Sequence, residues 1–165
     1  MAKTIFMKHR VIFILALFFS FVLLFAVQKP LFMLYNYPLA REAAFGEWLA
    51  VIWHGLSLDM TVAGYLTIIP ALICILSIWW SGGFWRKILK VYIIVVSVVV
   101  AAVFAVDMAL YPYWGLRVDA SIWFYLASTR EAMASVIFWE TARQIRLGIA
   151  YGIGVNYFLG KLILQ

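Results

Sequence analysis

The stretch "MTVAGYLTIIPALICILSIWW", Met60 to Trp80, decides the class of this protein. It is apolar almost throughout, and about 20 consecutive apolar residues are enough for a helix to cross the hydrocarbon core of a bilayer. Pro70 lies in its middle, so we expect a local kink there. The stretch therefore predicts a transmembrane helix.

The composition of the whole chain agrees with this prediction. Of its 165 residues, 67% are hydrophobic and only 12% are charged, and the mean hydropathy is +1.03. A soluble domain of this length has too little interior to bury so much apolar surface. We therefore predict an integral membrane protein.

Three further apolar runs extend the prediction along the chain. They cover residues 11–27, 88–110 and, least clearly, 147–164, beside the run at 60–80. The first run follows basic residues like a signal peptide, but its exit "FAVQKP" lacks a small-x-small cleavage pattern, which favours an uncleaved signal anchor. The predicted fold is an all-α polytopic bundle of about four spans, with interfacial helices on the outer side.

The distribution of charge predicts the orientation. With the N-terminus in the cytoplasm, the inner ends of the runs are basic: Lys3, Lys8, Arg10, Arg86, Lys87, Lys90 and Lys161. All seven carboxylates then fall on the opposite side or near its rim: Glu42, Glu47, Asp59, Asp107, Asp119, Glu131 and Glu140. This asymmetry follows the positive-inside rule and predicts a multi-pass protein of the cell (inner or plasma) membrane with a cytoplasmic N-terminus.

The same distribution bears on partners. The net charge of +6 is explained by topology and anionic headgroups, so membrane lipids and not nucleic acid are the expected partners. Cys74 is the only cysteine and lies in an apolar run, which excludes an intrachain disulfide and a thiolate metal cluster.

Two segments, Gln28 to Asp59 and Tyr111 to Arg146, remain on the outer side. Their Trp and Tyr content predicts that they lie in the headgroup layer. Within them, "EWLAVIWHGLSL" and "STREAMASVIFWETARQIR" have the composition of interfacial helices. We find no internal repeat of the kind that many secondary transporters carry.

A search for catalytic motifs gives no candidate catalytic or metal-binding residue. The chain has no Ser-His-Asp arrangement with supporting motifs, no phosphate-binding loop and no H-E-x-x-H sequence. His54 and Asp59 are five residues apart, a spacing that does not align them on one helical face. We interpret His54 as a polar residue at headgroup depth. Asp59 either caps the helix that follows it or contacts a lipid headgroup or the rim of the third span.

The stretch "DMALYPYWGLRVDASIWFYL" combines charges with large aromatic residues at the end of the third run. Asp107 and Tyr111 share a helical face, and Arg117 and Asp119 follow closely in sequence. An Asp-Arg-Asp network could hold the turn "YPYWG", or Arg117 could bind a lipid phosphate. The residues do not distinguish these two uses.

The last run carries a small-residue face. Gly148, Gly152, Asn156 and Gly160 recur at steps of four, which favours close helix packing with Asn156 donating or accepting a hydrogen bond across the interface. Chance and simple flexibility are the competing explanations.

Two segments resemble a known family. "HGLSLDMTVAGYLTIIP", His54 to Pro70, and "LYPYWGLRVDASIWFYL", Leu110 to Leu126, are similar to the N-terminal membrane domain of the lipoteichoic acid synthase family, within the alkaline phosphatase/sulfatase superfamily. The resemblance covers about Glu47 to Ser135. It implies a membrane anchor for an extracytoplasmic catalytic domain that uses a threonine nucleophile and a divalent metal, commonly manganese. That domain transfers a phosphoglycerol or related phospho-alcohol group from a phospholipid headgroup.

None of those catalytic motifs occurs in this sequence, so no catalytic residue is carried over and no cofactor is expected in this chain. The family tends to have five spans, whereas we count four. We expect the membrane domain of such a phosphotransferase, inactive alone, whose partners are membrane lipids and a missing C-terminal catalytic domain or other membrane helices. The alternatives are a small structural or partner-binding membrane protein and, less favoured, a transporter or lipid flippase. A transporter should show internal symmetry or charges deep within its spans.

Overall fold

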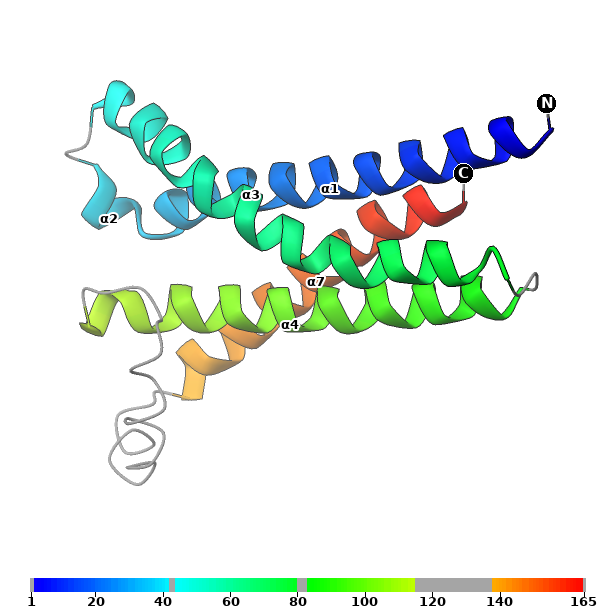
Figure 1. The fold of residues 1–165 in the computed structure, drawn as a ribbon. Helices are drawn as coiled ribbons and strands as arrows, with labels where there is room; N and C mark the ends of the chain where they lie inside the picture. The colour runs from blue at the N-terminus through cyan, green and yellow to red at the C-terminus, as the bar shows by residue number, and fades with distance from the viewer. Residues whose placement is uncertain (1, 42–43, 80–82, 115–137, 165) are drawn as a thin grey trace. The chain divides into compact units, whose positions relative to one another are not determined.

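A computed structural model describes residues 2–41, 44–79, 83–114 and 138–164. In these ranges the chain is all α-helical (Figure 1). The helices are α1 (Ala2–Tyr35), the short α2 (Tyr37–Ala40), α3 (Phe45–Leu76), α4 (Phe84–Trp114) and α7 (Phe138–Leu164). The predicted all-α fold is confirmed.

Three of these helices are long and apolar enough to cross a membrane. The candidate spans are Arg10–Tyr35, Phe45–Leu76 and Phe84–Ala109. They make the chain a multi-pass helical membrane protein. The fourth predicted span, 147–164, lies within α7, which is not among the candidates in the described part of the chain. That fourth crossing stays a prediction.

Much of the exposed surface of the three candidate spans is apolar, which suits contact with lipid. Large side chains that would be buried in a soluble protein point outward, such as Phe19 at 59% exposed and Val98 at 62% exposed. Lys29 and Asp59, by contrast, are buried. This arrangement suits hydrocarbon as the surrounding solvent, because apolar side chains cost nothing there and charges cost a great deal.

The helices are longer than the apolar runs from which they were predicted. α1 continues through Pro30 to Tyr35, past the expected exit at residue 27. α3 begins at Phe45 and includes the expected interfacial segment "EWLAVIWHGLSL" without a break before the span. Pro70 lies inside α3, buried, and the helix continues through it to Leu76.

The start of α3 corrects one interpretation of Asp59. The backbone N–H of Ala44 donates to Glu47 Oε2 at 2.9 Å, so the N-terminal cap of this helix lies at Ala44. Asp59 lies near the middle of α3, where every backbone N–H has a partner within the helix. The interpretation of Asp59 as a cap was therefore wrong.

The described residues divide into two compact units. One comprises residues 1–95 and 156–165, and the other comprises residues 96–155. In the first unit, α1 and α3 pack side by side and antiparallel, joined through α2 (Figure 1). Leu17 and Phe21 of α1 and Ala63 of α3 are fully buried. Side-chain packing of this kind is what holds helices together in lipid, where the hydrophobic effect does not.

Candidate functional site

An ion pair joins α1 to α3 within the candidate spans. The Lys29 ammonium donates a hydrogen bond to Asp59 Oδ2, and the two residues are only 8% and 7% exposed. Lys29 lies in the span Arg10–Tyr35 and Asp59 in the span Phe45–Leu76. Both charges therefore lie inside candidate spans and not beyond their ends.

Gly55 makes the room that this pair needs. It precedes Asp59 by one helical turn, so both residues lie on the face of α3 that meets Lys29. A Cβ at position 55 would collide with Lys29 Cε and would lie 2.7 Å from Lys29 Nζ. An added Cβ would therefore require the flexible end of the Lys29 side chain to shift from the position in which it reaches the carboxylate.

The energetics explain why the two charges occur together. A single charged side chain at the centre of a transmembrane helix costs roughly 2.5–3.5 kcal/mol on insertion scales. Removing one member of a buried pair typically costs about 3–5 kcal/mol, because the other charge is left uncompensated. Each of these two charges, Lys29 and Asp59, is therefore costly to bury without the other.

Lys29 is the site residue that the sequence analysis missed. Its signal was present, because the apolar sequence resumes after Pro30 as "LFMLY" and leaves Lys29 as an isolated cation between apolar stretches. An isolated charge within an apolar helix usually has a partner on another helix. Asp59 was singled out, but its partner lies thirty residues away in sequence.

A second polar contact joins α1 to α3 at the C-terminal end of α3. Arg10 of α1 donates to the carbonyl oxygens of Cys74 at 3.0 Å and Ser77 at 3.4 Å, where α3 ends. The last carbonyl groups of a helix have no partner within it and carry partial negative charge, so a guanidinium is stabilising there. Ser77 Oγ also donates to the Cys74 carbonyl at 2.8 Å.

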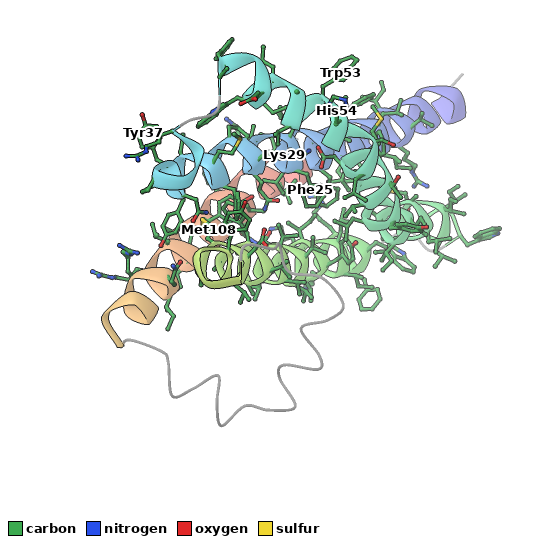
Figure 2. The ribbon with its side chains drawn as sticks, turned by 90° about the vertical axis from the view of Figure 1, so that its left-hand side faces the viewer. Phe25, Lys29, Tyr37, Trp53, His54 and Met108 are labelled. Atoms are coloured by element: carbon green, nitrogen blue, oxygen red, sulfur yellow. The ribbon has the colours of Figure 1, made fainter. Side chains whose placement is uncertain are left out.

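His54 takes no part in the ion pair. Its side chain is exposed, and Nδ1 lies 2.8 Å from the carbonyl oxygen of Ala50 in the preceding turn of α3. Figure 2 shows Lys29 on α1 and His54 on α3. Two of the predicted site residues, His54 and Asp59, thus have different surroundings although they are close in sequence.

The predicted network around Asp107 is described only in part. Asp107 is 4% exposed, and Tyr111, one turn later on α4, is half-buried. Arg117 and Asp119 lie outside the described residues. The Asp-Arg-Asp network and the alternative contact of Arg117 with a lipid phosphate both stay predictions.

In the unit of residues 96–155, α7 approaches α4 closely at two glycines. A Cβ at Gly148 would lie 3.0 Å from the Cβ of Ala105, and one at Gly152 would lie 3.1 Å from the Cβ of Ala101. The rings of Phe104 and Tyr151 pack beside this contact with centroids 4.8 Å apart.

The other two residues of the predicted face behave differently. Asn156 is half-buried and belongs to the other unit, as does Gly160. A Cβ at Gly160 would meet nothing within 4 Å. Close approach is thus seen at the first half of the predicted face.

Within the described ranges, no group of three or more His, Cys, Asp or Glu side chains gathers as a metal site would require. Three of the described polar contacts instead join two helices: the ion pair of Lys29 and Asp59, the Arg10 contact and the hydrogen bond from Tyr92 Oη to the Leu66 carbonyl at 2.7 Å. The site is therefore best described as a polar helix–helix interface in a membrane.

No protein family, curated protein or solved structure matches this chain. The similarity to lipoteichoic acid synthases consequently depends on the two quoted segments alone.

Proposed function

We propose that this chain is the membrane domain of a lipoteichoic acid synthase-like phosphotransferase that acts on phospholipid headgroups of the phosphoglycerol or phosphoethanolamine type. In this proposal it has no catalytic activity of its own. It holds a catalytic domain, which uses a divalent metal, at the outer surface of the cell membrane. The resemblance of His54–Pro70 and Leu110–Leu126 motivates the assignment.

One structural observation supports a scaffolding role. The segment His54–Pro70 lies within α3, and its one acidic residue, Asp59, is buried against Lys29 of α1. A carboxylate that neutralises an intramembrane lysine is occupied in holding two helices together. It is not poised to bind a catalytic metal or to activate a nucleophile, which favours an anchor over a self-sufficient enzyme.

The orientation belongs to the same proposal. Arg10 lies at the end of α1 that meets the end of α3, and Arg86, Lys87 and Lys90 are exposed in the first turns of α4. If α3 crosses the bilayer once, these four cations share a side. The positive-inside rule makes that side the cytoplasm.

A chimera tests the proposed role. The chain would replace the membrane domain of an active lipoteichoic acid synthase-like enzyme, and headgroup release from phosphatidylglycerol vesicles with manganese would be measured. The control fuses the same catalytic domain to an unrelated polytopic anchor. We expect the chimera to retain activity well above that control. An inserted chimera whose catalytic domain is folded but no more active than the control would contradict the proposal.

The isolated chain provides a second test. Purified and supplied with manganese, it should not cleave phosphatidylglycerol or phosphatidylethanolamine, because the proposed chemistry resides in another domain. Turnover that co-purifies with the chain through several chromatographic steps would show that this domain has a catalytic site of its own.

One observation supports the alternative of a transporter or flippase. Ionisable side chains within spans often mark proton or substrate pathways, and Lys29, Asp59 and Asp107 all lie within candidate spans. Proteoliposomes distinguish the two roles. A fluorescent phosphatidylglycerol analogue that changes leaflet faster with the chain than without it would favour the flippase.

A further inference from the structure

We propose that the Lys29–Asp59 pair is the device that makes α1 and α3 enter the bilayer as one hairpin and fixes their register. In this inference neither helix is stable in lipid without the other. The inference depends on the contacts of Lys29, Asp59, Gly55 and Arg10, and it requires no phosphotransferase activity of the chain.

The two charges of the pair lie well inside their helices. Lys29 is followed in α1 by Pro30 and five further residues, of which Leu31 and Leu34 are exposed apolar side chains. Fourteen residues of α3 precede Asp59. Each charge is thus inside a helix and not at its end. Inserted separately, each helix would bring an uncompensated charge into the membrane, whereas inserted together they bring a neutral pair.

A glycine on α3 lies directly beside the lysine side chain. Gly55 leaves open the space through which the lysine side chain reaches Asp59. The other glycine in the middle of α3, Gly64, has nothing within 4 Å of the position of a Cβ. The close approach is therefore local to the ion pair and is not a general property of glycines in this helix.

Two polar contacts together set the register of α1 against α3. Arg10 and Lys29 are nineteen residues apart on α1, which corresponds to about 28 Å along a helix. Arg10 holds the end of α3, and Lys29 holds its middle at Asp59. A slip of one turn between the helices would break both contacts, so the two together specify a single alignment.

A double-mutant cycle tests the inference in the full chain. The variants are Lys29→Met, Asp59→Asn and the double variant, reconstituted in vesicles of phosphatidylglycerol and phosphatidylethanolamine. The controls are Lys90→Met, which removes an exposed positive charge, and Glu47→Gln, which removes an exposed negative charge while the glutamine oxygen can still accept from the Ala44 N–H. The readouts are the folded fraction at a fixed denaturant concentration and the inserted fraction that resists alkaline extraction.

We expect each single variant to lower the ratio of folded to unfolded chain by at least about tenfold, because an unpaired charge stays in the membrane. The double variant should regain most of this loss, and the controls should resemble the unaltered chain. Where a single variant fails to accumulate, accumulation of the double variant gives the same answer.

A steric variant tests the fit without changing charge. Gly55→Ala keeps both Lys29 and Asp59 but places a methyl group where the end of the lysine side chain lies. The lysine must then shift away from Asp59, and the weakened contact should lower the folded fraction. Gly64→Ala on the same helix is the control and should not.

Two results would overturn the inference. One is that the single variants match the exposed-charge controls. The other is that the double variant is no better than the worse single variant. Failure here would remove the scaffolding argument at Asp59. Because neither readout measures enzymatic activity, the chimera would still test the proposed phosphotransferase function separately.

Discussion

At the scale of single residues, Arg10 shows how a basic residue at the start of a span can have a structural use beyond orientation. Its guanidinium donates to two carbonyl groups where α3 ends, and this contact joins two helices that are far apart in sequence. The positive-inside rule accounts for a positive charge at position 10, but it does not predict the contact of Arg10 with α3.

Removal of this contact should weaken the α1–α3 hairpin. Hydrogen bonds to charged groups contribute about 1.5–3 kcal/mol, so we expect Arg10→Met to lower the free energy of unfolding in detergent by about 1–3 kcal/mol. Arg86→Met, at an exposed position of α4, serves as the control. Equal effects of the two substitutions would show that charge alone, and not the carbonyl contact, is responsible.

The residue scale is also where sequence reasoning was least complete. Asp59 was recognised as a candidate, but it was placed at a rim because the span was taken to begin at Met60. Lys29 was placed in the exit of the first span, because the apolar run was taken to end at Val27. Proline is tolerated within membrane helices, where neighbouring groups satisfy the freed carbonyl. The pairing of Lys29 with Asp59 depends on helix alignment, which local sequence does not encode.

At the scale of helices, small residues decide where α7 and α4 come close. Gly148 and Gly152 lie against the methyl groups of Ala105 and Ala101, so no large side chain separates the two helices there. The step of four residues in the sequence predicted a packing face. It could not predict that Gly160, on the same face, would have open space, because that depends on the partner helix.

This contact makes a substitution test with an internal control possible. Gly152→Leu should destabilise the α4–α7 contact by about 1–3 kcal/mol, the usual cost of overpacking a close contact. Gly154→Leu, two residues later on the same helix, has nothing within 4 Å of its Cβ position and should have little effect. Chemical unfolding in detergent measures both. A larger loss for Gly154→Leu would contradict the described packing.

A hydrogen bond between helices gives a milder prediction at the same scale. Tyr92 Oη donates to the Leu66 carbonyl at 2.7 Å and joins the start of α4 to α3. Tyr92→Phe should therefore cost about 0.5–1.5 kcal/mol of stability, whereas Tyr65→Phe, at an exposed position, should not. The comparison uses the same thermal unfolding measurement for both variants, and indistinguishable midpoints would argue against the bond.

Element lengths show the limit of hydropathy as a guide. The apolar runs located α1, α3 and α4 correctly, because lipid-facing helices must be apolar. They did not locate the helix ends. α3 extends fifteen residues before the predicted start of its span, because Gly46 and Gly55 do not interrupt the helix and Ala44 with Glu47 provides its cap.

At the scale of the whole molecule, the central claim is that α1, α3 and α4 cross the membrane, with polar contacts between α1 and α3 at two depths. Composition alone predicted the class. The partners of the buried charges emerged only from the folded arrangement, because they come from different helices.

Cysteine accessibility on either side of α3 tests that claim most directly. Arg41→Cys and Gly83→Cys, each made in a Cys74→Ala background, place a thiol at exposed positions before and after this helix. We predict that an impermeant maleimide labels the Arg41→Cys variant in intact cells and labels the Gly83→Cys variant only after permeabilisation. The reverse pattern would keep the crossing and invert the proposed orientation. Labelling of both variants from the same side would contradict the account, because α3 would then not cross the membrane.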